Sequence, residues 1–357
     1  MDPNVAAAGV CLLAALPLLV MLAQSPRARL FGWRAAKLAP LLVHEVFWWA
    51  SMVPTGIRIH LAYSYASWRR FRGVLHKDIA YGRHARQTLD VYAPDVSRGE
   101  TVVFVHGGAW GSGNKKSYVL LAQNLARLGY VVVVPNYRIF PHATVPGQVD
   151  DIRNIVGWAR DGLGPMGGDA DNVVLVGHSA GAHLLAMAVL HERMETAGGR
   201  ATTHEFEWLR RNMAGVAHVR AVVSLSGVFD IDEHYVWESL RGVEYLSTME
   251  PAMDGRANFA ALSPTKVMRR HASEHEDDFA LWPTFHVLHG TADGTVPSRS
   301  SADFVDELRA ADVRVTYDEM AGVGHSEVVL AMMAPGPPWN AITQRVIDVI
   351  ERAFDAQ

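Results

Sequence analysis

A serine at position 179 lies between two glycines in the run Gly177-His178-Ser179-Ala180-Gly181. Residues 172–176 before it are mostly β-branched and apolar, as in a buried strand, and residues 182–194 after it favour a helix. In this strand–turn–helix context, a Gly-x-Ser-x-Gly run places the serine hydroxyl at the apex of a strained turn, where it acts as a nucleophile. A chance Gly-Ser loop would not explain the flanking elements, so we predict that Ser179 is a nucleophile.

A serine nucleophile needs a base, and the base needs an acid that orients it. Asp293 follows an apolar strand predicted at 284–289, and His325 follows a strand predicted at 313–319. Both come after Ser179 in the order serine, acid, histidine, which is typical of hydrolases with such a serine turn. Open sheets place their ligand sites at the carboxyl ends of strands. We therefore predict Asp293 as the acid and His325 as the base.

Other side chains compete for these two roles. Asp293 could instead cap a helix or shape a turn, and Asp230 is a second acid at a strand end. For the base, the competing histidines are His286 and His289, but both precede the predicted acid. His271 and His275 fall in the charge-rich segment 269–278, which is more typical of a solvated face than of a metal site. No histidine pair has ligand spacing within a helix, so the prediction includes no metal and no cofactor.

Acyl transfer also needs N–H donors fixed in place before the oxyanion forms. The run His106-Gly107-Gly108-Ala109-Trp110 follows a strand predicted at 101–105, where such a loop belongs. The predicted donors are the backbone N–H groups of Gly107, Gly108, Ala109 and, just after the nucleophile, Ala180. A plain Gly-Gly turn would explain neither the position of this run nor its pairing with the serine turn. We expect His106 to fix the loop and His178 to pack beside the serine turn.

Strands and helices alternate along most of residues 75–357, which predicts an α/β fold with a mostly parallel central sheet flanked by helices. The remaining strands are predicted at 76–81, 87–92, 131–134 and 219–225. The remaining helices are predicted at 117–128, 147–161, 300–310 and 339–353. Residues 195–218 are polar and are interpreted as an insertion. The long, mixed segment 229–275 is predicted to form a cap over the site.

The composition sets limits on what the chain can be. A chain of 357 residues can hold one large α/β domain and an appendage. The formal net charge of -4 is too small to indicate nucleic acid as a partner. The only cysteine, Cys11, lies in an apolar N-terminal stretch, so the predicted catalytic part has no disulfide and no thiol nucleophile. The oligomeric state is not indicated.

The N-terminal stretch 5–23, VAAAGVCLLAALPLLVMLA, carries no charge. At about 1.5 Å per residue it is just long enough for a hydrocarbon core of about 30 Å. A cleaved signal peptide would need a positive start, but Asp2 is the only charge before it. The positive residues come afterwards: Arg27, Arg29, Arg34 and Lys37. The positive-inside rule then predicts a transmembrane anchor over residues 1–24, with the catalytic domain in the cytosol.

The segment 25–74 contains a second apolar stretch, 38–65, which charged residues interrupt. Its uncharged part, 46–57, is too short to span a bilayer comfortably. The aromatic side chains in and after it suit a membrane interface: Trp48, Trp49, Tyr63, Tyr65 and Trp68. We predict an interfacial helix or re-entrant segment. The alternatives are a second span, which would reverse the side of the catalytic domain, and a helix packed over the domain as a lid.

Residues 75–355 resemble the α/β-hydrolase superfamily, in the branch with an HGG-type oxyanion loop, and within it the isoprenylcysteine methylesterases. The motifs that carry the resemblance are residues 89–92 (LDVY), 105–110 (VHGGAW), 136–141 (NYRIFP), 177–183 (GHSAGAH), 289–293 (HGTAD) and 296–297 (VP). The resemblance implies the α/β-hydrolase fold over 75–357 and hydrolysis of the methyl ester of a prenylated cysteine. It also implies a location at endoplasmic reticulum or Golgi membranes, with prenylated protein C-termini as substrates.

Three other functions stay open at this point. One is a broad-specificity esterase for lipid-linked or other hydrophobic esters. Another is a kynurenine formamidase-like hydrolase, which shares the HGG-x-W and GHSAGAH runs; those enzymes are soluble, so the predicted anchor argues against it. The third is a binding protein on the same fold, which the intact Ser179, Asp293 and His325 disfavour. A prenyl chain partitions into a bilayer by about 0.8 kcal/mol per buried CH₂, so an anchored enzyme would meet such a substrate in two dimensions.

Overall fold

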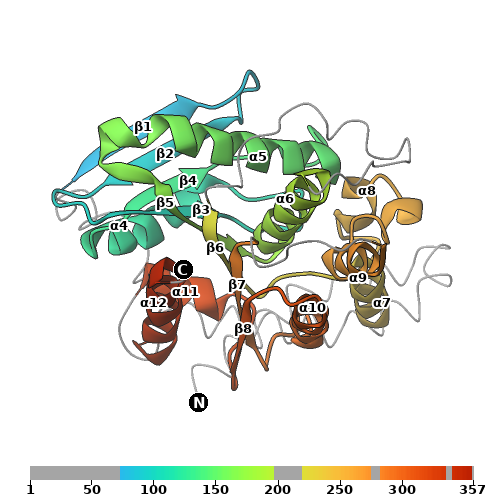
Figure 1. Ribbon diagram of the computed structural model, residues 1–357. Helices are drawn as coiled ribbons and strands as arrows, with labels where there is room; N and C mark the ends of the chain where they lie inside the picture. Colours follow the sequence, from blue (N-terminus) through green and yellow to red (C-terminus); the bar gives the residue numbers. More distant parts are fainter. Residues whose placement is uncertain (1–72, 197–218, 275–281, 335–339, 356–357) are drawn as a thin grey trace, which may run out of the picture.

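The structure is a computed structural model that describes residues 73–196, 219–274, 282–334 and 340–355. These residues contain one eight-stranded sheet in the order β1-β2-β4-β3-β5-β6-β7-β8 (Figure 1). The strands are β1 Val74–Ala80, β2 Thr88–Ala93, β3 Gly99–Val105, β4 Val131–Pro135, β5 Gly168–His178, β6 Val219–Leu225, β7 Thr284–Gly290 and β8 Val315–Met320. Only the β1–β2 and β2–β4 pairs are antiparallel, so the predicted mostly parallel sheet is confirmed.

The register of the central strands brings their carboxyl ends to one edge. Val105 of β3 pairs with Gly177 of β5, and Gly177 pairs in turn with Ser224 of β6. At the other end of the parallel part, Gly290 of β7 pairs with Met320 of β8. The loops that follow these strands therefore start at the same edge of the sheet. They carry the predicted nucleophile, acid, base and oxyanion loop.

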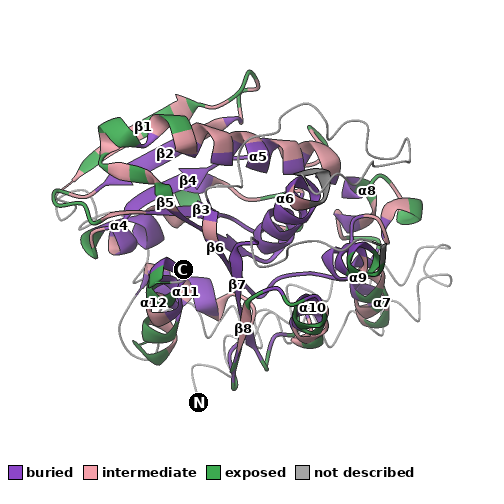
Figure 2. Ribbon diagram, viewed as in Figure 1, coloured by how far each residue is buried: buried purple, intermediate pink, exposed green. Residues whose placement is uncertain are grey.

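Helices cover both faces of the sheet, which is why its central strands are apolar on both sides (Figure 2). Strand β4 is buried at every position. One face packs against α5 Val145–Gly162, α6 Ala180–Thr196 and α10 Arg299–Ala310, in a core cluster that includes Val103 and Val105. The other face packs against α4 Val119–Arg127, α11 Glu327–Met333 and α12 Asn340–Asp355, with Val102 and Phe104. This two-faced burial fixes the register of β3, because a slip by one residue would exchange the two sets.

A helical segment lies between β6 and β7, beside the carboxyl edge of the sheet (Figure 1). It contains α7 Ile231–Arg241, α8 Met249–Ala252 and α9 Pro264–Glu274. Asp230 begins α7 as its N-cap, and Gly242 ends it in a left-handed conformation with φ 74°. Within this segment, α9 packs against α6 and α10. Residues 231–274 are called the cap below.

Most predicted elements are found within a few residues of their expected bounds. β3 begins two residues before the strand predicted at 101–105, and α11 was not predicted. The predicted anchor over 1–24 lies outside the described residues, and so does the segment 25–74 apart from its last two residues. The predicted insertion at 195–218 also lies almost entirely outside them. Within the described ranges, no helix has the length and apolar character needed to cross a membrane.

Candidate active site

Ser179 lies at a sharp turn between β5 and α6. Its φ is 54°, a left-handed conformation that is uncommon outside glycine and that marks local strain. The turn is held from two sides, because the Ser179 N–H donates to the Leu225 carbonyl of β6 at 2.9 Å and its carbonyl accepts from the His183 N–H at 3.1 Å. A Cβ on Gly181 would stand 2.3 Å from the Val105 carbonyl oxygen, so only glycine permits this approach of α6 to β3. The structure thus places Ser179 on the strained turn that the sequence predicted.

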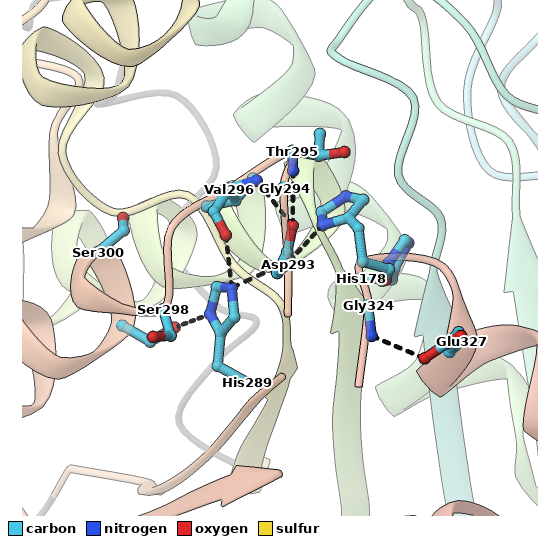
Figure 3. A network of polar contacts seen from close by, with 12 residues as sticks. His178, His289, Asp293, Gly294, Thr295, Val296, Ser298, Ser300, Gly324 and Glu327 are labelled. Carbon is cyan, nitrogen blue, oxygen red and sulfur yellow. Dashed lines mark hydrogen bonds and ion pairs between the residues drawn. The ribbon is translucent and has the colours of Figure 1, made fainter. Parts of the chain in front are cut away.

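Asp293 lies in the loop after β7, with all its carboxylate hydrogen bonds inside the protein (Figure 3). Its Oδ1 accepts from the backbone N–H groups of Thr295 at 2.9 Å and Val296 at 2.8 Å. Its Oδ2 accepts from His325 Nδ1 at 2.7 Å and from His289 Nε2 at 3.0 Å. Burial acts to raise the pKa of this carboxyl, but the hydrogen bonds from both imidazoles outweigh burial and hold its pKa well below 3.8. Asp293 is therefore a fixed, ionised acceptor.

His325 lies between β8 and α11. Since a carboxylate only accepts, its Nδ1 carries the proton toward Asp293, and Nε2 of the neutral ring carries the lone pair. Its backbone carbonyl accepts from His178 Nε2 at 2.9 Å, and the two rings lie 4.9 Å apart between centroids. His178 directly precedes Ser179, so this contact ties the His325 loop to the serine turn. Burial lowers the pKa of His178 to about 3, which keeps this neighbour neutral.

The glycine-rich loop after β3 lies against the serine turn. A Cβ on Gly107 would stand 2.9 Å from the Ser179 Cβ, so a larger residue here would collide with the Ser179 side chain. The next three residues have left-handed φ values, of 128° at Gly108, 47° at Ala109 and 59° at Trp110. This is strain held by the surrounding contacts. The structure therefore brings the predicted oxyanion loop directly to Ser179.

Side chains of the loop itself, of the segment after β4, of α5 and of the cap hold this loop in its strained shape. His106 donates from Nδ1 to the Gly107 carbonyl at 2.8 Å and stacks on Tyr137 with centroids 4.5 Å apart. Burial lowers the pKa of His106 to about 4, so the ring is neutral and serves the loop structurally, as the sequence predicted. The Trp110 carbonyl accepts from Gln148 Nε2 of α5 at 2.9 Å. The Thr248 hydroxyl of the cap donates to the Ala109 carbonyl.

A further contact links the loop to the cap through α6. Trp110 Nε1 donates to His183 Nδ1 at 3.1 Å, so Nδ1 is the unprotonated ring nitrogen. His183 Nε2 therefore carries the hydrogen and donates to the Leu262 carbonyl of the cap at 2.8 Å. Burial lowers the pKa of His183 to about 4, which preserves this neutral form. These supports were not predicted from the sequence, although Trp110 and His183 both stand in the motifs that carry the family resemblance.

The competing residues are placed elsewhere. Asp230 caps α7 by accepting from the Glu233 N–H at 3.1 Å, and it lies 3.4 Å from Lys266 Nζ. His286 bonds to the Thr316 hydroxyl through Nδ1. The expectation of a solvated face is wrong for His271, which is buried in α9 with its ring 6.2 Å from that of Trp282; His275 lies outside the described residues. Within the described part of the chain, no group of three or more His, Cys, Asp or Glu side chains could hold a metal ion.

The chain is similar in sequence to one protein family and to proteins named as esterases. The BD-FAE family matches residues 89–308, more than half of the chain. The chain is 31% identical over 265 residues to "Probable isoprenylcysteine alpha-carbonyl methylesterase ICMEL2" of Arabidopsis thaliana, over 73% of this chain and 59% of that protein. It is 30% identical over 284 residues to "Esterase LipC" of Mycobacterium tuberculosis, over 77% of this chain and 65% of that protein. The chain thus spans less than two thirds of the length of these relatives.

A solved structure has the same fold. The crystal structure of Esterase B from Lactobacillus rhamnosis superposes with a TM-score of 0.63 at 20% sequence identity, covering 91% of this chain and 97% of that chain. At this identity the likeness concerns the fold. Together with the sequence match, it shows that the chain belongs to the BD-FAE family within the α/β-hydrolase superfamily, where its relatives are named as carboxylic ester hydrolases.

Proposed function

We propose that the protein is a serine hydrolase of carboxylic esters, in which Ser179 is the nucleophile, His325 the base and Asp293 the acid that orients it. The observation that carries the proposal is the 2.7 Å hydrogen bond from His325 Nδ1 to Asp293 Oδ2, made beside a serine on a left-handed turn. This bond fixes the tautomer in which Nε2 can accept a proton. A loop with strained backbone lies against the same serine, as acyl transfer requires.

The proposed reaction has two steps. His325 Nε2 takes the proton of the Ser179 hydroxyl while the serine oxygen attacks the ester carbonyl, and the resulting oxyanion accepts from loop N–H groups. The donors proposed are Gly107, Gly108, Ala109 and Ala180. His325 then gives the proton to the departing alcohol oxygen, and the C–O bond breaks to leave an acyl-serine. A water molecule, deprotonated by His325, attacks this acyl group and releases the carboxylic acid, which restores Ser179.

For the substrate, we propose the methyl ester of an isoprenylated cysteine. The name of the Arabidopsis relative supports it, and so does the apolar stretch 5–23, which would bring the domain to a bilayer where prenyl chains partition. We further propose that this stretch anchors the protein in endoplasmic reticulum or Golgi membranes with the catalytic domain in the cytosol. The similarity to LipC favours the second candidate, a broader esterase for lipid-linked esters.

A hydrolysis panel tests the function and separates the candidates. Full-length protein is assayed on a prenylcysteine methyl ester in vesicles, on a long-chain lipid ester and on N-formylkynurenine, with Ser179→Ala as the matched control. Preference for the prenylcysteine ester supports the proposal, and equal rates on both lipid esters support the broader esterase. If folded Ser179→Ala retains normal activity on every substrate, the serine mechanism is wrong.

Two assays test the proposed location. Alkaline carbonate should leave the full-length protein in the membrane fraction. Protease added to intact microsomes should digest the catalytic domain if it faces the cytosol. Protection of the domain from protease would contradict the proposed side and favour a second span within 38–65.

A further inference from the structure

The Oδ2 atom of Asp293 is shared by two histidines. His325 Nδ1 donates to it at 2.7 Å, and His289 Nε2 donates to it at 3.0 Å. Figure 3 shows His289 pointing toward Asp293. The sequence argues against His289 as the base, because His289 precedes the predicted acid. The structure instead places it as a partner of the acid.

The contacts of His289 fix which ring nitrogen carries its hydrogen. Nε2 faces two oxygens that can only accept, Asp293 Oδ2 and the Val296 carbonyl at 2.9 Å, so Nε2 is protonated. Nδ1 lies 2.7 Å from the Ser301 hydroxyl of α10, which can donate to it. Every polar atom of the ring therefore has a partner, and a neutral imidazole satisfies all three contacts. The ring cannot flip without placing a C–H group against Asp293.

Burial separates this histidine from solvent and from substrate. The side chain of His289 is 0% exposed, against 13% for His325, and Ser301 is also fully buried. Ser301, His289 and Asp293 thus form a second chain of hydrogen-bonded side chains that ends at the same carboxylate as the proposed Ser179–His325–Asp293 triad. Because this second chain is buried, an ester cannot reach it. The second chain is available for positioning and not for chemistry.

We propose that His289 is a positioning residue that holds the Asp293 carboxylate in place and takes up part of the charge on Oδ2. This inference rests on the proposed function, since it assigns His289 a role in the same site. By donating to the oxygen that His325 also uses, His289 makes that oxygen a weaker acceptor toward the His325 ring. The base is thereby kept from holding its proton too tightly when the alcohol leaves.

The groups around the two imidazoles define what a change at His289 would alter. Among the described residues, the titratable groups that the structure places around His325 are Asp293, the neutral ring of His178 and, at the start of α11, Glu327, whose carboxylate accepts from the Gly324 N–H at 2.7 Å. His289 is faced by Asp293 and by the uncharged Ser301 hydroxyl. Loss of the His289 donor therefore changes one thing near His325, the acceptor strength of Oδ2. The acid limb of the activity profile should then move to higher pH, because the imidazolium of His325 would be better stabilised.

The test compares two variants at His289 in the full-length protein. His289→Gln keeps an N–H donor at a similar reach, whereas His289→Leu removes it at similar volume. The readouts are kcat and KM on a soluble p-nitrophenyl ester from pH 5 to 9, per active site counted with a fluorophosphonate probe. A hydrogen bond to a charged group is worth about 1.5–3 kcal/mol, so His289→Leu should lower kcat about tenfold or more with little change in KM. Its acid limb should move upward in pH, and His289→Gln should stay near wild type.

Two results would overturn the inference: wild-type profiles in both variants, or equal losses in both. If His289→Leu does not fold, ¹⁵N-histidine NMR of the wild-type protein decides instead. A neutral His289 protonated on Nε2 supports the role, and a ring protonated on Nδ1 contradicts it. His325→Ala is assayed in parallel, and retained activity there would refute the proposed function while the NMR result still tests His289.

Discussion

Two buried aspartates in this protein have saturated hydrogen bonds but different partners. Asp151 of α5 accepts from Gln87 Nε2 at 2.7 Å, from the Arg138 N–H at 2.7 Å and from the Arg138 guanidinium at 2.7 Å. Asp293 accepts from two imidazoles and two backbone N–H groups. A guanidinium stays protonated in proteins, whereas an imidazole gains and loses a proton near neutral pH. The carboxylate of Asp151 thus makes a fixed ion pair, whereas the carboxylate of Asp293 holds imidazoles that can exchange a proton, as the proposed mechanism requires.

The largest expected effect is on kcat, and it comes from removing the charge of Asp293. Asp293→Asn should lower kcat about 10⁴-fold, because the amide supplies no negative charge and no longer enforces the imidazole tautomer. The unfolding free energy, measured by urea denaturation, should change by less than the activation free energy that this loss of kcat represents. The matched control is Asp230→Asn, where asparagine caps a helix about as well as aspartate. A greater loss of activity in the control would move the acid assignment to Asp230.

Breaking the ion pair of Asp151 and Arg138 should lower stability and leave activity nearly unchanged. Asp151→Asn leaves the Arg138 guanidinium without its counter-charge and should lower the unfolding free energy. Loss of one partner of a fully buried pair costs about 3–5 kcal/mol, and we expect about 2–3 kcal/mol here because the Arg138 side chain is 27% exposed. Activity per folded molecule should change little. A variant of normal stability and low activity would contradict the structural role.

Acidification should weaken the fold through its buried neutral histidines. The pKa of His106 and that of His286 are each lowered to about 4 by burial, against an ordinary value of 6.5. Between these values the unfolded chain binds more protons, so stability is full above about pH 6.5 and falls as pH drops toward 4. Each of the two histidines should lower the unfolding free energy by about 1 kcal/mol between pH 7 and 5.5. Asp293 adds a loss only below its ordinary 3.8, since its pKa is lowered.

Urea midpoints at pH 7 and 5.5 measure this dependence, and His286 offers the control. It bonds to Thr316 on β8 and has no place in the proposed mechanism. His286→Gln should reduce the loss of unfolding free energy between pH 7 and 5.5 by the contribution of one histidine, and it should leave kcat unchanged. An unaltered slope would mean that the imidazole of His286 is not held neutral.

The smallest expected effect is at the rim of the site. Thr248→Val removes the hydroxyl that donates to the Ala109 carbonyl while keeping the shape of the side chain. The loss of one such bond, about 0.5–1.5 kcal/mol, should lower kcat roughly two- to tenfold. Thr248→Ser, which keeps the hydroxyl, should behave like the wild type. Equal rates in all three proteins would show that other contacts hold the oxyanion loop.

The sequence predicted the parts of this arrangement that depend on local pattern. The turn at Ser179 follows from a buried strand, two glycines and a helix, and the loops of Asp293 and His325 follow from strand ends and chain order. The missed contacts depend on packing between distant segments. His289 meets Ser301 only because α10 packs on the sheet beside β7. The solvated face predicted for His271 is wrong, because the charged residues just before it in the sequence lie on the exposed face of α9 whereas His271 lies on the buried face.

The cap is one continuous insertion between β6 and β7, and such a segment would be easy to exchange during evolution. In this protein, however, Thr248 and the Leu262 carbonyl of the cap hold the loop that lies against Ser179. If the loop is the oxyanion loop of the proposed mechanism, a descendant that replaced the cap would lose two of its supports. The cap and the loop are therefore expected to change together in evolution, and small substitutions within the cap should be tolerated more readily than its complete replacement.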